Sequence, residues 1–196
     1  MIFDDPKTYA KEHGLPVLML IDWQTGFRDL DYWGPRNNPA AESNVEKLLS
    51  FWRQQGGRII HVRHDSTTPA SPLFPGKDSH VFEAFSTPQA DEAVYGKNVN
   101  SAFIATTLED DLRAAGHTRL VMSGISTDHC VNTTTRMAGN LGFDVTLVAD
   151  ACFCFDRIHP DGRIIPAQMV HDVHLAALSG EFAKIASTDA VIQQHS

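Results

Sequence analysis

The chain has 196 residues, of which 42% are hydrophobic and 20% charged, and its formal net charge is -8. This length is sufficient for one well-buried core, so we expect a single domain over residues 1–196. The acidic balance argues against nucleic acid or an anionic membrane as a partner. Every apolar run is far shorter than a bilayer span, so we expect no membrane segment.

The N-terminus and the cysteines favour a reducing compartment. Residues 1–14 form a polar lead-in without the basic and apolar regions of a secretory leader. The three cysteines are an odd number and do not form a disulfide framework. We therefore expect a cytoplasmic protein.

The first half of the chain reads as strand, helix, strand and a long loop. An apolar run predicts a strand at 15–21, followed by an aromatic-rich loop at 23–35. Asn38 is the expected cap of a helix that starts at Pro39 and ends at the glycines after residue 55. A second strand follows at 58–62. The stretch 64–92 has weak periodicity, and loops of this length often close a site or contact a partner.

The second half continues the alternation. Thr107 with Asp110 resembles a variant capping box, and Thr188 is the expected cap of a last short helix. The helix over 167–179 is expected to pack with Val170, Val173, Ala177 and Leu178 on one face. In chain order the predicted elements are strand 93–95, helix 107–116, strand 119–123, helix 127–141, strand 143–149, loop 152–163, helix 167–179 and strand 182–186.

Continuous apolar strands that alternate with helices predict a parallel sheet covered on both faces. Right-handed crossovers then give an α/β fold, a doubly wound three-layer α/β/α sandwich with six parallel strands. In such folds ligands bind at the carboxyl edge of the sheet, where the strand order reverses.

Three chemically active side chains fall on that edge. Asp22 lies just past the first predicted strand, Lys97 just past the third and Cys130 just past the fourth. A carboxylate, an ammonium and a thiol are the components of a nucleophilic site. Asp22 can accept the thiol proton, while Lys97 and a helix N-terminus both favour the thiolate. Free backbone N–H groups between Ser126 and Cys130 can bind an oxyanion.

Each residue alone has a simpler interpretation. An isolated cysteine is more often an inert buried thiol, Asp22 can be a turn residue, and Lys97 can be a solvated charge. The hypothesis of a catalytic site therefore rests on the combination of the three residues with the sequence around Cys130.

That surrounding sequence resembles a known family. The matching segments are Leu20-Ile21-Asp22-Trp23-Gln24-Thr25-Gly26-Phe27, Gly96-Lys97-Asn98-Val99-Asn100-Ser101-Ala102-Phe103, Ser123-Gly124-Ile125-Ser126-Thr127-Asp128-His129-Cys130-Val131, Phe155-Asp156-Arg157 and Gly180-Glu181-Phe182-Ala183. In this order they resemble the isochorismatase-like cysteine hydrolases, a superfamily that includes nicotinamidases. The resemblance extends over essentially the whole chain.

The resemblance implies specific roles. It implies a catalytic triad of Asp22, Lys97 and Cys130, and a cis peptide between Ile125 and Ser126. It also implies an oxyanion hole formed by the N–H groups of Ser126 and Cys130, and a substrate pocket lined by Phe27 and Phe155. The expected substrate is a small molecule, and members of the family often form homodimers or homotetramers.

The chain departs from the metal-binding nicotinamidases, which carry an Asp-x-His pair after the second strand. Here the region reads His61-Val62-Arg63-His64-Asp65-Ser66, so we expect no active-site metal of that kind and no cofactor. Isochorismatases proper cleave a vinyl ether, and this reaction stays an alternative. Retention of Cys130 favours acyl chemistry at a carboxamide C–N bond through a thioester.

Other motifs have weaker functional interpretations. His171 and His174 lie three residues apart on a predicted helix, where packing is the better interpretation. Cys152 and Cys154 are expected to be ordinary, partly buried thiols. His129 neighbours Cys130 but points in another direction on a helix, so it is a poor base. A non-catalytic small-molecule binder and a thiol redox sensor that uses Cys130 are the alternatives to an enzyme.

Overall fold

A parallel sheet of six strands forms the centre of the structure, a computed structural model that describes residues 14–196. The order of the strands is β3-β2-β1-β4-β5-β8. They are β1 (Val17–Ile21), β2 (Ile59–His64), β3 (Ala93–Lys97), β4 (Arg119–Ile125), β5 (Asp144–Phe153) and β8 (Lys184–Ala186). The predicted doubly wound fold is confirmed, whereas the polar lead-in at residues 1–13 lies outside the described part.

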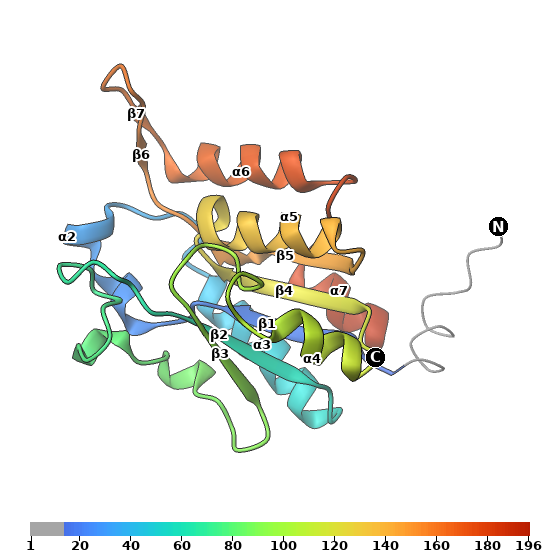
Figure 1. The fold of residues 1–196 in the computed structure, drawn as a ribbon. Coiled ribbons are helices and arrows are strands. Elements are labelled where there is room, and N and C mark those ends of the chain that lie inside the picture. The colour runs from blue at the N-terminus through green and yellow to red at the C-terminus, as the bar shows by residue number, and fades with distance from the viewer. Residues whose placement is uncertain (1–13) are drawn as a thin grey trace.

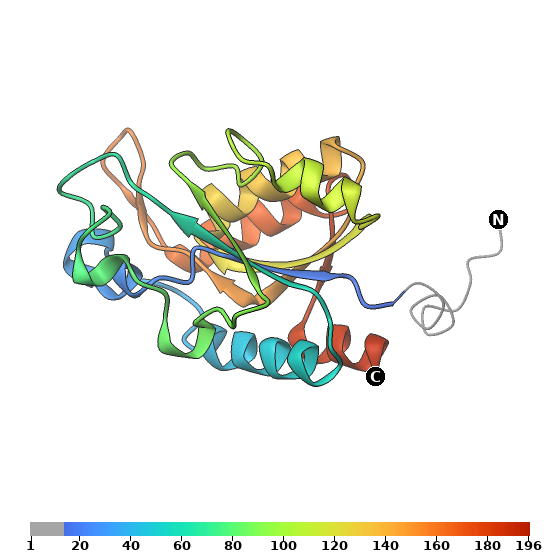
Figure 2. The same ribbon diagram turned by 60° about the horizontal axis from the view of Figure 1, so that its bottom comes forward.

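Helices cover both faces of this sheet. In Figure 2, α3 (Ala41–Gln54) and α7 (Thr188–His195) lie below it, and α4 (Leu108–Ala114), α5 (Asn132–Asn140) and α6 (Ala167–Leu178) lie above it. Alternate residues of β1 enter the two cores: Met19 and Ile21 pack toward α4 and α5, Leu18 and Leu20 toward α3. This explains why β1 is a continuous apolar run. No helix among residues 14–196 has the length and apolar character needed to cross a membrane.

The strand order reverses between β1 and β4. From β1 the chain builds outward through β2 to β3, and then returns to build β4, β5 and β8 on the other side (Figure 1). β1 and β4 pair in parallel, with Ile21 opposite Gly124 at their carboxyl ends. The segments that follow these two strands therefore begin side by side, at the place where α/β folds bind ligands.

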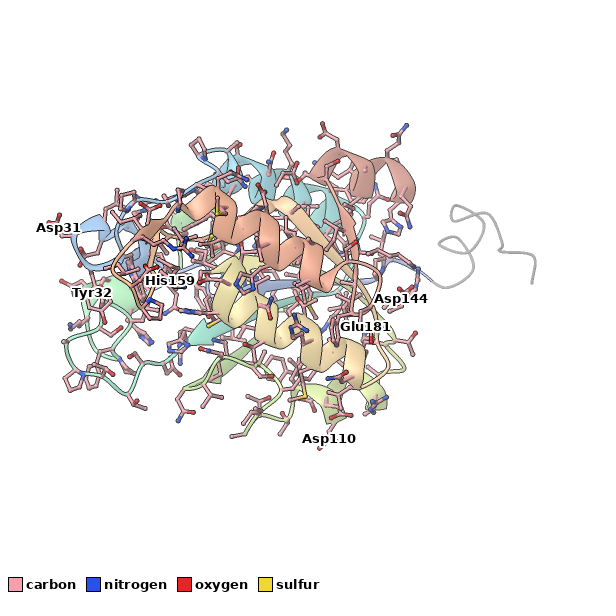
Figure 3. All side chains as sticks on the ribbon, turned by 90° about the horizontal axis from the view of Figure 1, so that it is seen from above. Asp31, Tyr32, Asp110, Asp144, His159 and Glu181 are labelled. Carbon is pink, nitrogen blue, oxygen red and sulfur yellow. The ribbon has the colours of Figure 1, made fainter. Side chains whose placement is uncertain are left out.

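Short elements gather at the same end of the molecule. Figure 3 shows Tyr32 of α2 (Leu30–Trp33) and His159, which lies between residues 158 and 164, at one end, and Asp144, the first residue of β5, at the other. The short elements are η1 (Thr25–Arg28), α2, η2 (Asp78–His80), η3 (Ala84–Ser86), β6 (Arg157–Ile158) and β7 (Ile164–Ile165). The predicted loop at 152–163 thus contains the end of β5 and half of an antiparallel hairpin.

Two of the predicted helix caps, Asn38 and Thr188, are wrong because their side chains form hydrogen bonds with residues of β5 instead. Asn38 precedes α3 by three residues and has a left-handed φ of 47°. Its amide donates instead to the carbonyls of Asp150 (2.9 Å) and Cys152 (2.7 Å). Thr188 donates through its N–H and its hydroxyl to Asp150 Oδ1, so Ser187 is the cap of α7.

The predicted capping box of α4 and the predicted buried face of α6 also differ from the structure. Thr107 Oγ1 donates to Asp111 Oδ2 at 2.7 Å, so Thr107 and Asp110 do not form a capping box. On α6 the buried residues are Ala167, Val170, His171 and Leu178, whereas Val173 is 60% exposed. His171 therefore belongs to the buried face in place of Val173, and its Nδ1 forms a hydrogen bond with Thr127 Oγ1 at 2.8 Å.

A buried carboxylate ties the end of the 64–92 stretch to the core. Glu92 contacts Arg53 Nε at 2.7 Å and His61 Nε2 at 2.8 Å, and its side chain is 5% exposed. It also accepts the N–H of Gln89 at 2.9 Å. Burial alone would raise the pKa of Glu92, but these contacts outweigh it and lower the pKa to about 2.

Glu92→Gln is expected to lower the free energy of unfolding at pH 7 by about 1–2 kcal/mol, less than the full equivalent of this pKa shift because solvent partly screens the ion pair with Arg53. Because the folded-state pKa is depressed, the contribution is complete above the unfolded value of 4.5 and is lost as the pH falls toward 2. Urea unfolding of both proteins at a series of pH values checks this. A difference in stability that stays constant down to pH 2 would contradict the assignment.

Candidate active site

Side chains from three strand ends meet where the strand order reverses. Asp22 is the first residue after β1, and Lys97 is the last residue of β3 rather than a residue beyond it. Cys130 lies in η4 (Thr127–Val131), a single π-helical turn that follows β4. Asp22 adopts a left-handed φ of 57°, and its N–H donates to Val62 O at 2.9 Å. This turn ends β1 and directs the chain away from the sheet.

The three predicted residues are in contact. Lys97 Nζ lies 2.7 Å from Asp22 Oδ2 and 3.2 Å from Cys130 Sγ. The relative exposure of Asp22 is 0%, that of Lys97 is 3% and that of Cys130 is 6%. A buried ion pair therefore lies directly against a buried thiol.

The ammonium is held in its charged form. Burial by itself lowers the pKa of Lys97, but the charge and hydrogen bond of Asp22, together with Cys130, outweigh it. The net effect raises the pKa of Lys97 above its ordinary value. Lys97 is thus a fixed cation at neutral pH.

The surroundings of Cys130 favour the neutral thiol. Burial raises the pKa of Cys130 strongly, and the Asp22 carboxylate raises it further. Lys97 lowers the pKa but does not compensate for these two effects. The resting site therefore contains a neutral thiol next to the ion pair of Asp22 and Lys97.

His64 is a fourth member of the site that the sequence did not reveal. It is the last residue of β2 and pairs in register with Lys97. Its Nδ1 lies 3.0 Å from Lys97 Nζ and 3.9 Å from Cys130 Sγ. Burial, followed by the charge of Lys97, lowers the pKa of His64, so we assign a neutral ring that accepts from the ammonium.

A buried amide fixes the position of His64. Gln24 Oε1 accepts the N–H of His64 at 2.7 Å, and Gln24 Nε2 donates to the carbonyls of His64 and His80. Gln24 is 0% exposed. It therefore connects the chain just past Asp22 to the end of β2 and to the 64–92 stretch. Asn100 also approaches the site, with its Oδ1 3.7 Å from Cys130 Sγ.

The approach to Cys130 has an unusual backbone. The peptide between Ile125 and Ser126 is cis, and Val131 N–H donates to Ser126 O across the wide turn. Gly124 lies so close to the carbonyl of Ile21 that a Cβ atom there would clash with it. Glycine is therefore required for β4 to pack against β1 at this point.

Phe27 and Phe155, the predicted pocket residues, lie together in an aromatic group. Their ring centroids are 6.2 Å apart in a stacked arrangement, and Trp33 packs on both rings. Phe27 is 6% exposed and Phe155 0%. Both belong to the core between the sheet and α3, whereas Cys130 packs in the opposite core. Their contact with a substrate stays a prediction.

The remaining motifs take structural positions. His171 and His174 form hydrogen bonds with Thr127 and Asn132, so packing is the role that the contacts describe. Cys152 and Cys154 are fully buried rather than partly buried, and all three cysteines are free. His129 Nε2 lies 3.5 Å from Asp128 Oδ2, and His129 Nδ1 lies 3.5 Å from Arg157 Nη2.

The structure is an α/β protein in which a buried thiol, ammonium and carboxylate meet where the strand order of the sheet reverses. Residues 16–190 match the model of the Isochorismatase domain. The chain belongs to the isochorismatase family.

Relatives of known sequence and structure agree with this assignment. The isochorismatase family protein YrdC of Bacillus subtilis is 40% identical over 90% of this chain and 94% of its own. A solved isochorismatase-family structure from Chromobacterium violaceum is 44% identical, has a TM-score of 0.88 and covers 92% of this chain and 93% of its own. The maleamate amidohydrolase of Pseudomonas putida is 24% identical over 91% of this chain and 86% of its own.

Proposed function

We propose that the protein is a cysteine hydrolase that cleaves the C–N bond of a small carboxamide. The observation that carries the proposal is the buried contact of Cys130 Sγ with Lys97 Nζ, which is itself paired with Asp22. This arrangement combines a nucleophile, a proton acceptor and a fixed cation in one site. The similarity to a maleamate amidohydrolase favours an amide over other bonds.

The geometry supports a mechanism in which Asp22 moves the protons. Asp22 accepts the thiol proton as Sγ attacks the carbonyl carbon, and the oxyanion is held by the N–H groups of Ser126 and Cys130. Asp22 then donates this proton to the leaving nitrogen, and the C–N bond breaks to leave a thioester. Water, deprotonated by Asp22, attacks the thioester and releases a carboxylic acid and the free thiol.

The role of Lys97 in this mechanism is to stay charged. Its ammonium stabilises the Asp22 carboxylate before the proton is transferred and stabilises the negative charge that develops on Sγ during it. Its raised pKa keeps it out of the proton transfers themselves. The neutral thiol at rest is consistent with a sulfur that becomes nucleophilic only when Asp22 removes its proton.

A screen of small carboxamides for release of ammonia or amine tests the proposal. Samples quenched during turnover should show an acyl adduct on Cys130 by mass spectrometry. The screen should include esters of the same acids, since a thioester mechanism also accepts oxygen leaving groups. Turnover by a variant without a thiol at position 130 would exclude the mechanism.

A further inference from the structure

The ammonium of Lys97 occupies the centre of a potential set of metal ligands. Its three N–H donors match three acceptors: Asp22 Oδ2 at 2.7 Å, His64 Nδ1 at 3.0 Å and Cys130 Sγ at 3.2 Å. The ligand atoms of these residues all lie within 4.8 Å of one another. No ammonium proton is left for another partner.

Carboxylate oxygen, imidazole nitrogen and thiolate sulfur are the ligands that zinc prefers in proteins. Zinc binds them at about 2.0–2.3 Å, so each ligand atom would have to move by about 1 Å or less to replace its contact with Nζ. A second observation points to a cation here. Asp22 Oδ1 is buried and has no hydrogen-bond partner within the described residues, so the carboxylate has an oxygen to spare.

The charges also balance. With a protonated thiol at Cys130, the charges of the Asp22 carboxylate and the Lys97 ammonium, which form an ion pair at 2.7 Å, sum to zero. A divalent ion bound to one carboxylate, one thiolate and a neutral imidazole sums to zero as well. The exchange replaces one ammonium and one thiol proton by one metal ion, so it buries no additional charge.

We propose that Asp22, His64 and Cys130 form a potential binding site for zinc or a similar divalent cation. The ammonium of Lys97 fills the position of the ion and so prevents such ions from binding to the thiol. This inference does not depend on the proposed hydrolase activity, because metal binding requires no turnover. It assigns Lys97 a protective role in addition to its electrostatic one.

Lys97→Ala, titrated with Co²⁺ and then Zn²⁺, tests the proposal. The variant is expected to show the near-ultraviolet absorption of a cobalt-bound thiolate and to release one proton for each ion bound, measured by calorimetry in two buffers. The wild-type protein at the same Co²⁺ concentration should lack this absorption. Adding Cys130→Ser should abolish the band, and adding His64→Ala should weaken binding by about 10–100-fold or more.

Two results would overturn the inference. One is a Lys97→Ala variant that binds Co²⁺ no more tightly than the wild type, and the other is binding that survives loss of both Cys130 and His64. Far-ultraviolet circular dichroism checks that the variant is folded. Should it be unfolded, Lys97→Ser is titrated in its place, because its hydroxyl keeps a hydrogen-bond donor in the cavity beside Asp22. The Lys97→Ser variant must then show the same cobalt absorption band. Adding Cys130→Ser must abolish this band, and adding His64→Ala must weaken binding.

Discussion

Cys130→Ser is expected to abolish carboxamide turnover, with kcat lower by about 10⁴-fold or more. Serine nearly preserves the volume of this buried position, which is 6% exposed, so the fold should be retained. A serine hydroxyl is a far weaker acid than a thiol, so Asp22 removes its proton much less readily. Steady-state assays on the substrate found in the screen, with mass spectrometry of the quenched enzyme, measure the loss of both turnover and adduct.

The matched control is Cys154→Ala. Cys154 is a free thiol with 0% exposure, and its Sγ donates to Ala167 O at 3.1 Å in a separate small cluster. Its removal is expected to lower stability by about 1 kcal/mol and to leave kcat unchanged. Wild-type turnover by Cys130→Ser, or an adduct that remains in that variant, would contradict the role of Cys130.

Asp22→Asn is expected to lower kcat by about 10²–10⁴-fold, because the proton acceptor for the thiol is lost. The substitution is suited to this position because asparagine tolerates the left-handed φ of 57° that Asp22 adopts. It should also destabilise the fold by about 3–5 kcal/mol, since the buried Lys97 ammonium loses its charged partner. Assays well below the melting temperature separate the catalytic loss from the loss of stability.

Glu92→Gln provides the comparison for this variant. It makes the same carboxylate-to-amide change in another buried ion pair, with Arg53 and His61 instead of Lys97. We expect it to reduce stability and leave kcat unchanged, so a loss of rate in Asp22→Asn cannot be attributed to destabilisation alone. An Asp22→Asn enzyme with the wild-type kcat would show that another group accepts the thiol proton.

The sequence predicted the fold well because burial on both faces leaves a simple pattern. β1 is a continuous apolar run and β4 contains one at Leu120–Met122, and each strand is buried along nearly its whole length. Once the strands are placed, the rule for parallel sheets brings their carboxyl ends to one edge. Asp22 and Cys130 could therefore be placed together without any knowledge of the contacts between them.

His64 was missed because the strand that carries it was predicted to end at residue 62. The apolar pattern stops there, but β2 continues to His64 because it pairs with β3 up to Lys97. This pairing joins residues far apart in sequence and leaves no local signal. The polar caps failed for a similar reason, since Asp150 and its neighbours in β5 attract the side chains of Asn38 and Thr188.

The residues that line the substrate pocket could not be predicted from the sequence for a different reason. Phe27 and Phe155 could be proposed from the resemblance, yet a ring that lines a pocket and a ring that fills a core follow the same residue pattern. In the structure they stack on each other and on Trp33. Their position depends on how three loops pack together, which is a property of side-chain geometry rather than of periodicity.

The π-helical turn that carries Cys130 also constrains how this chain can change in length. A π turn contains about one residue more than an α turn, and each residue of an α-helix rotates its side chain by about 100° around the axis. Deleting one residue from Thr127–Val131 could give a continuous α-helix with α5, but it would turn the thiol away from Lys97. A substitution in this turn leaves its helical phase unchanged, whereas a single deletion would put the thiol of Cys130 out of phase with Lys97.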